Sequence, residues 1–291
     1  MSVPAVHVLR SVLYMPSSNA RALEKAKTIP ADAIILDLED AVAPDAKQTA
    51  RAQAVAAVQS GEYGRRVLTI RCNGLDTPWG EDDLRAAATS GATAVVVPKV
   101  SGAAHLAEVV RVLDEAGAPA ELAVWAMVET PTAVLDVRDI ASSARVTVLV
   151  MGTNDLAKEL RAALVPGRAP LLPHLATALL AAREAGIVIL DGVFNDVKDL
   201  EGFEAEALQG KDLGFDGKTL VHPTQVEVAN RVWAPSEDEV AYAHRVIGAF
   251  DEATAAGKGV VTVDGRMIEN LHVDNARHTL ATAEAVAELA Q

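Results

Sequence analysis

The sequence has very little cysteine and few aromatic residues. Cys72 is the only cysteine among 291 residues, which excludes an internal disulfide and any metal cluster held by several cysteines. Aromatic residues make up 3% of the chain, although 50% of it is hydrophobic. The core must therefore be built mainly from alanine, valine, leucine and isoleucine. A chain of this size can bury a sizeable core, since a β/α barrel holds about 250 residues in one domain.

Basic residues are scarce relative to acidic ones. The chain carries 26 Lys and Arg against 40 Asp and Glu, so its formal net charge at pH 7 is −14. Such a surface repels phosphate backbones, and we expect no nucleic-acid partner. The chain opens without a signal-peptide pattern, and no run approaches the roughly 18 apolar residues of a membrane span. We therefore expect a soluble, cytoplasmic protein with no membrane partner.

Short apolar runs rich in valine and isoleucine alternate with longer amphipathic stretches. Such runs are typical of strands buried on both faces, and the stretches between them have helical periodicity. The predicted strands lie at 11–16, 33–40, 66–73, 92–100, 122–130, 145–155, 187–194 and 218–223. The predicted helices lie at 19–28, 44–59, 80–89, 102–117, 131–142, 168–186, 196–210 and 223–232.

Eight successive strand–helix units predict an α/β fold, a (β/α)8 TIM barrel that forms a catalytic domain over residues 1–232. Residues 233–291 exceed what a barrel needs, and we interpret them as a C-terminal helical extension. They predict a helix at 236–256, a short β-like run and a last helix from about residue 272 to 289.

Charged side chains gather at one end of the predicted strands, where a barrel carries its active site. Glu129 and Asp155 end neighbouring strands, and two carboxylates facing one cavity repel each other unless a cation or proton lies between them. Without cysteine ligands they suit a hard cation, and Mg2+ fits best. The alternative is that each carboxylate caps a helix or pairs with an arginine.

Arg71 ends an otherwise apolar strand and offers a planar fork to a carboxylate. It either binds an anionic ligand or forms an ion pair with Asp37 or Glu39 of the neighbouring strand. Both hold if the acids orient the arginine, a supporting role that we also assign to Asp40.

Two further groups of residues are candidates for binding an anionic ligand. Gly152, Thr153 and Asn154 either direct backbone N–H groups at it or form a plain strand-to-helix turn. Basic residues of the first two predicted helices either form a rim for it or lie on a solvated face; they are Lys25, Lys27, Lys47 and Arg51.

Several motifs occur in order along nearly the whole chain. They are RSVLYMP, AIILDLEDAVAPDAK, RCN, VPKV, VET, MGTNDL and GFDGKTLVHPTQ, followed by GRMIENLHVDNAR. Together they resemble the HpcH/HpaI aldolase and citrate lyase β-subunit superfamily, and most closely its acyl-CoA lyase branch, which includes malyl-CoA and citramalyl-CoA lyases.

The resemblance implies a metal-bound keto acid in a barrel covered by a C-terminal lid. Mg2+, with Mn2+ as the alternative, would be held by Glu129 and Asp155, and Arg71 would bind the keto-acid part. Residues 152–155 would line the substrate site. The resemblance also implies a coenzyme A thioester as substrate, lying near the first helices, where we assign Tyr14, Lys25 and Arg51 as its contacts.

In related lyases an acidic residue after a G-x-M-I motif reaches the active site of a neighbouring subunit as acid/base, which implies a homotrimer or homohexamer. Relatives usually have Asp there, whereas this chain has Glu269. The extra methylene matters, because a shift of about 1 Å at a catalytic group can cost on the order of a hundredfold in rate. Glu269 is either the acid/base or a cap of the last helix.

The expected reaction is reversible C–C cleavage of malyl-CoA, β-methylmalyl-CoA or citramalyl-CoA to glyoxylate or pyruvate and a short acyl-CoA. Three alternatives remain open. A thioesterase would direct water at the thioester carbonyl of the same substrate. A citrate lyase β subunit would act on an acyl-carrier-protein thioester. A non-catalytic binding protein would have a degenerate site, against which the presence of Arg71, Glu129 and Asp155 argues.

Overall fold

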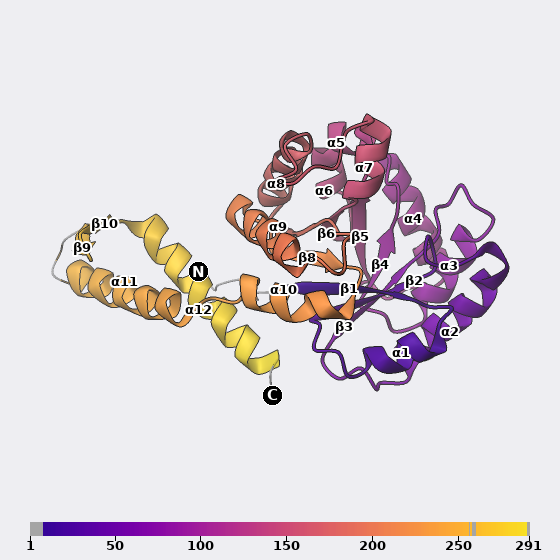
Figure 1. Ribbon diagram of the computed structural model, residues 1–291, viewed down its shortest axis with the longest axis horizontal. Helices are drawn as coiled ribbons and strands as arrows, with labels where there is room; N and C mark the ends of the chain where they lie inside the picture. The colour runs from indigo at the N-terminus through magenta and orange to yellow at the C-terminus, as the bar shows by residue number, and fades with distance from the viewer. Residues whose placement is uncertain (1–7, 256, 258–259, 290–291) are drawn as a thin grey trace. The chain divides into compact units, whose positions relative to one another are not determined.

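The computed structural model describes residues 8–255, 257 and 260–289, drawn in colour in Figure 1. The chain divides into two compact units. One spans Leu9–Val232, and the other includes the residues from Trp233 onward. Each unit has its own hydrophobic core.

The first unit is a closed barrel of parallel strands surrounded by helices (Figure 1), so the predicted (β/α)8 fold is confirmed. All eight predicted strands are present, in the predicted order. They are β1 (Ser11–Pro16), β2 (Ala33–Asp37), β3 (Val67–Arg71), β4 (Ala94–Val97), β5 (Ala123–Val128), β6 (Val146–Met151), β7 (Val188–Asp191) and β8 (Gly217–Leu220).

The helices cover the outside of the barrel, as the apolar face of each amphipathic stretch requires. They are α1 (Ala20–Ala26), α2 (Lys47–Gln59), α3 (Gly80–Ala88), α4 (Ala103–Glu115), α5 (Pro131–Leu135), α6 (Val137–Ala141), α7 (Thr153–Leu160), α8 (Leu172–Ala185), α9 (Leu200–Leu213) and α10 (Val226–Trp233). Short 3-10 turns, Pro44–Ala46 and Pro223–Gln225, precede α2 and α10.

The pleat of the strands explains why polar side chains reach the mouth of the barrel. Successive residues of a strand point to opposite faces, so every second residue shares one core. Ile35 and Met127 belong to the core inside the barrel. Two residues further along the same strands lie Asp37 and Glu129, which therefore point to the same side, where the strands end.

Several boundaries differ from the predictions, three of them as follows. The predicted strand 145–155 ends at Met151, and its last residues form the first turn of α7. Asp155 lies in that first turn, where a carboxylate favours helix formation. The predicted helix 131–142 is split into α5 and α6 at Asp136, and the predicted helix 168–186 begins only at Leu172.

The second unit packs two helices on a short hairpin. It contains α11 (Glu237–Ala255), β9 (Val261–Val263), β10 (Arg266–Ile268) and α12 (Asn270–Leu289). Asp264 and Gly265 link the two strands, both with positive φ, as a tight two-residue hairpin turn requires. Neither long helix here, nor any other helix in the described part of the chain, is apolar enough to cross a membrane.

Candidate active site

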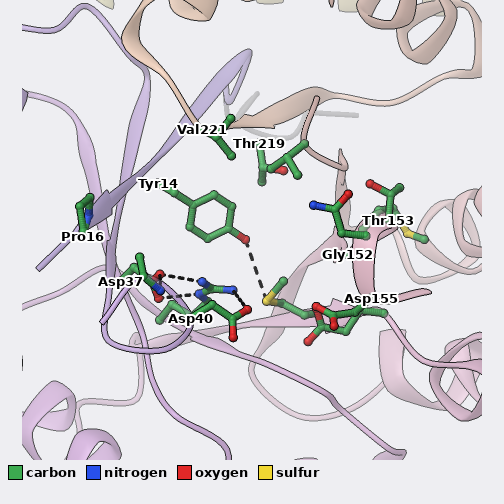
Figure 2. Close-up of a pocket in the computed structure, with 16 residues that line it drawn as sticks. Tyr14, Pro16, Asp37, Asp40, Gly152, Thr153, Asp155, Thr219 and Val221 are labelled. Atoms are coloured by element: carbon green, nitrogen blue, oxygen red, sulfur yellow. Dashed lines mark hydrogen bonds and ion pairs between the residues drawn. The ribbon is translucent and has the colours of Figure 1, made fainter. Parts of the chain in front are cut away.

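A cavity of about 470 Å3 opens at the carboxyl ends of the barrel strands. It is lined by residues from strand ends that are far apart in the sequence (Figure 2). The lining residues are Tyr14, Pro16, Asp37, Asp40, Ala41, Arg71, Met127, Glu129, Met151, Gly152, Thr153, Asn154, Asp155, Val193, Thr219 and Val221. The predicted metal ligands, Arg71 and the residues 152–155 are thus brought together.

Arg71 is held at the cavity wall by acidic neighbours. Asp37 accepts hydrogen bonds from Nε and Nη2, both at 2.6 Å (Figure 2), and Glu39 pairs with Nη1 at 2.9 Å. Burial alone would lower the pKa of Arg71, but the Asp37 carboxylate raises it well above its ordinary value. The hydrogen bonds to Asp37 use two of the five N–H groups of the guanidinium, and the contact with Glu39 is an ion pair without a hydrogen bond, so N–H groups remain for a ligand. The ion pair and the ligand-binding role are therefore compatible.

Glu129 is almost completely buried, with 2% of its surface exposed. Its Oε1 accepts a hydrogen bond from the backbone N–H of Lys99 at 2.6 Å, and Gly152 packs against its Oε2. Burial, together with the charges of Glu39 and Asp155, raises the pKa of Glu129 to about 7, although the Lys99 N–H opposes the shift. Burial disfavours the ionised form of this carboxyl group, and a cation beside it would stabilise that form.

Asp155 supplies the second carboxylate of the candidate metal site. It is half-buried in the first turn of α7, and within the described residues its side chain forms no hydrogen bond or ion pair. No group of three or more His, Cys, Asp or Glu residues suited to a metal occurs in that part of the chain. Two carboxylates with room beside them fit Mg2+, which keeps waters and substrate oxygens in its remaining positions. The donor set therefore suits the predicted ion.

Residues 152–154 form the start of α7 beside these carboxylates. Gly152 is the N-cap residue, and Thr153 is buried in the first turn. The N-terminus of a helix favours a negatively charged ligand, because its first N–H groups have no partner within the helix. The Asn154 amide exchanges two hydrogen bonds with the Asn195 amide, at 3.0 and 2.8 Å. That exchange fixes the Asn154 side chain at the cavity edge.

The three acids of the loop after β2 differ in their contact with Arg71. Asp37 and Glu39 bind it directly, whereas Asp40 is exposed and lies 3.8 Å from Nη1. Burial raises the pKa of Glu39, and the charges of Arg71 and Lys99 only partly offset this. Asp37 also accepts hydrogen bonds from the backbone N–H groups of Glu39 and Ala41. Asp37 therefore holds the Arg71 guanidinium in place and also fixes the backbone of the loop that follows it.

The three residues assigned to coenzyme A fall in different places. Tyr14 lines the cavity, with its ring 4.8 Å from the Arg71 guanidinium carbon. Lys25 is exposed on α1, away from the lining residues. The guanidinium of Arg51 binds Asp82 and Asp83 of α3 and does not line the cavity.

Two lysines, Lys47 and Lys99, make contacts near the site that the sequence did not predict. Lys47 is not on a solvated face: its ammonium is buried and donates to the Leu38 and Glu39 carbonyls and to Asn73, each at 2.7 Å. Lys99 adopts a left-handed conformation, with φ of 48°, that directs its N–H at Glu129. The VPKV motif pointed to Lys99. No sequence pattern indicates that the Lys47 side chain, on a helix, is buried and turned toward the loop carbonyls.

Glu269 lies between β10 and α12, in the second unit. Its backbone N–H donates to His272 Nδ1, and its carbonyl accepts from the His272 and Val273 N–H groups. The residue thus caps α12 through its backbone. Its carboxylate is exposed and forms no hydrogen bond or ion pair within the described residues, so it remains available to another molecule.

Comparison with known proteins identifies a family over most of the chain. A family model described as HpcH/HpaI aldolase/citrate lyase matches residues 10–223, and one described as a C–C bond lyase of the TIM-barrel fold matches residues 167–287. These matches cover both the barrel and the extension. The description of the second model names cleavage of carbon–carbon bonds.

Named relatives of two kinds match this chain. A (3S)-malyl-CoA thioesterase of Cereibacter sphaeroides is 51% identical over 97% of this chain and 96% of its own. The citrate lyase β subunit of Escherichia coli is 36% identical over 94% of this chain and 93% of its own. A solved structure, protein CitE from Mycobacterium tuberculosis in complex with magnesium, acetoacetate and coenzyme A, has a TM-score of 0.77 at 28% identity, covering 94% of this chain and 97% of that one.

Proposed function

The chain belongs to the HpcH/HpaI aldolase/citrate lyase family, and on that basis we propose that it hydrolyses a malyl-CoA thioester to malate and free coenzyme A, with Mg2+ held by Glu129 and Asp155. The observation that carries this proposal is the 51% identity to a (3S)-malyl-CoA thioesterase over nearly the whole of both chains. This choice places the thioesterase ahead of the C–C cleavage expected from the motifs alone.

The cavity supports binding of a 3-hydroxy-carboxylate head group. Bound Mg2+ would supply Lewis-acid polarisation of the substrate oxygens that it touches. Arg71 keeps N–H groups on Nη1 for the substrate carboxylate, and Asp37 fixes the plane of that guanidinium. The first N–H groups of α7, beside Thr153, would bind further carboxylate oxygen. The CitE structure, in complex with magnesium, acetoacetate and coenzyme A, supports this class of ligand.

Hydrolysis also needs a group that takes a proton from water. We assign this role to Glu269, from a neighbouring subunit of a homotrimer or homohexamer, because its carboxylate is exposed and unpaired within its own described chain. The oxygen of water would bond to the thioester carbon, and the C–S bond would break. The proton taken by Glu269 would then pass to the leaving thiolate.

C–C cleavage is the second candidate. The family models and the citrate lyase β relatives favour it. The same head group would then release glyoxylate, and Glu269 would protonate the acetyl-CoA enolate at carbon. Citrate lyase β chemistry on a carrier-protein thioester is a third candidate, favoured by the 36% identity to that subunit.

The test is an assay of malyl-CoA in which free thiol and glyoxylate are measured separately, with Mg2+ and with EDTA. Thiol without glyoxylate, lost in EDTA, is the expected result. Glyoxylate without thiol would overturn hydrolysis in favour of C–C cleavage. If neither product forms, the same assay on a citryl thioester of the acyl carrier protein tests the third candidate.

A further inference from the structure

The side chain of Tyr14 brings a hydroxyl group into the catalytic cavity without a strong hydrogen-bond partner. Tyr14 lies on β1 and lines the cavity together with Arg71, Glu129 and Asp155. Within the described residues, the polar contact of its hydroxyl is with the Met127 sulfur, at 4.0 Å (Figure 2). A thioether sulfur is a weak acceptor, so this O–H is available to a stronger acceptor in the cavity.

The ring of Tyr14 is held in place by its surroundings. Tyr14 pairs with Ile35 in the strand register, and its ring lies 4.8 Å from the Arg71 guanidinium carbon. Arg71 is itself bound by Asp37 and Glu39. A donor fixed by a strand and a buried ion pair is preorganised, which is the condition under which a single hydrogen bond assists catalysis strongly.

The phenol is a donor and not a base. Burial raises the pKa of Tyr14 above its ordinary value, and the opposing charge of Arg71 does not offset that. The nearby carboxylates Glu129, Asp37 and Glu39 raise it further. At neutral pH the hydroxyl therefore keeps its proton.

We propose that the Tyr14 hydroxyl donates a hydrogen bond to the thioester carbonyl oxygen of the substrate and stabilises the negative charge that develops there. This inference rests on the proposed function. When water adds to the carbonyl carbon, the C=O electron pair moves to that oxygen, and it returns as the C–S bond breaks. In C–C cleavage the same oxygen becomes the enolate oxygen. Tyr14 keeps its proton in both reactions.

The test compares Tyr14→Phe with Tyr14→Leu. The phenylalanine keeps the ring beside Arg71 and removes only the hydroxyl. We expect kcat for malyl-CoA to fall about 10²- to 10³-fold in Tyr14→Phe, with KM changed by less than about threefold, as for other oxyanion donors. A role of the ring alone predicts normal kcat in Tyr14→Phe and a loss only in Tyr14→Leu, and that result would overturn the proposal.

Tyr63→Phe is the matched control. The Tyr63 hydroxyl is also buried and donates to the Leu23 carbonyl at 2.9 Å, away from the cavity lining. This variant should lose thermal stability and keep its kcat. A similar fall in kcat would show that Tyr14→Phe acts through the fold.

A spectroscopic measurement tests the hydrogen bond from Tyr14 separately from the proposed thioesterase activity. The infrared carbonyl stretch of acetyl-CoA labelled with 13C at its carbonyl should shift to lower frequency on binding to the wild-type protein with Mg2+ and glyoxylate, and less so in Tyr14→Phe. An equal shift in both proteins would contradict the hydrogen bond. If malyl-CoA is not turned over, the proposed function fails, and the shift still decides the role of Tyr14.

Discussion

At the scale of single residues, Glu129 links the candidate metal site to pH. Its pKa is raised to about 7, above the ordinary 4.5 of a glutamate. A bound cation requires the ionised form, so Mg2+ and a proton compete for this group. We expect the Mg2+ affinity, measured by calorimetry, to be about tenfold weaker at pH 6 than at pH 8, which corresponds to one competing proton. The same affinity at both pH values would contradict this assignment.

The raised pKa of Glu129 also makes the free energy of unfolding depend on pH. Because the folded-state pKa lies above the unfolded one, the metal-free fold is favoured while Glu129 is protonated. That contribution is present below about pH 4.5 and is lost as the pH rises through about 7. Glu129→Gln removes this titration, so we expect the free energy of unfolding of the metal-free variant to lack this contribution to its pH dependence.

Gly152 is the residue that leaves room for the Glu129 carboxylate. A Cβ at this position would overlap the Cβ and Oε2 of Glu129, although the backbone conformation of Gly152 suits any residue. We expect Gly152→Ala to displace the carboxylate and weaken Mg2+ binding by at least about tenfold, since a 1 Å error in a ligand is costly. Gly248→Ala, where nothing lies within 4 Å of the new Cβ, should leave calorimetric Mg2+ affinity unchanged.

The sequence predicts the position of a residue best when that position depends on neighbouring residues in the chain, and less well when it depends on distant segments. That Glu129, Asp155 and Arg71 line one cavity could be predicted, because the strand ends of a barrel converge and each residue lies at or shortly after the end of an apolar run; their chemical roles stay predictions. The inward turn of Lys47 could not, since it depends on carbonyl groups of a loop that the sequence does not place.

At the scale of elements, strands were predictable and the start of α7 was not. A buried parallel strand is a continuous apolar run, which is visible without knowledge of its partners. The segment that begins at Thr153 is short and polar at its start, so it reads as the end of the preceding strand. Only the turn at Gly152, which fits against Glu129, separates the two.

Barrel closure depends on one glycine. β8 pairs with β1 over a short register, Ser11–Leu13 with Lys218–Leu220, and Gly217 lies beside the Leu9 carbonyl. A Cβ at Gly217 would overlap that oxygen, which is backbone and cannot move aside. We expect Gly217→Ala to lower the free energy of unfolding in urea by about 1–3 kcal/mol, as for other overpacked positions. Gly248→Ala, in the exposed interior of α11 with nothing within 4 Å of the new Cβ, should not lower it, because alanine has a higher helix propensity than glycine.

At the scale of the whole molecule, the alternation of strands and helices was enough to predict the barrel, while the choice between hydrolysis and C–C cleavage was not visible. Both reactions use the same head group, metal ligands and arginine. They differ in which bond of one substrate breaks, and under the proposed mechanism that choice depends on the placement of water and of Glu269. No periodicity or motif reports on that placement.

The proposed oligomer makes a prediction about mixed subunits. Arg71→Ala and Glu269→Gln should each be nearly inactive on malyl-CoA. If Glu269 acts in a neighbouring barrel, subunits exchanged in equal amounts should restore activity to about a quarter of wild type, because a complete site needs one intact residue from each of two chains. An Arg71→Ala, Glu269→Gln double variant mixed with Glu269→Gln is the control. The control mixture contains no intact Glu269 and should stay inactive. If the first mixture also shows no recovery of activity, Glu269 does not act in a neighbouring barrel.

The most direct test of the account is the position of solvent oxygen in the product. Malyl-CoA would be turned over in H2 18O with Mg2+, and malate and glyoxylate would be analysed by mass spectrometry. Attack of water on the thioester carbonyl predicts malate with one 18O in the carboxyl group that was bound to sulfur, equal in amount to the thiol released. Glyoxylate together with acetyl-CoA, and no labelled malate, would contradict it and show that the carbon–carbon bond is the one that breaks.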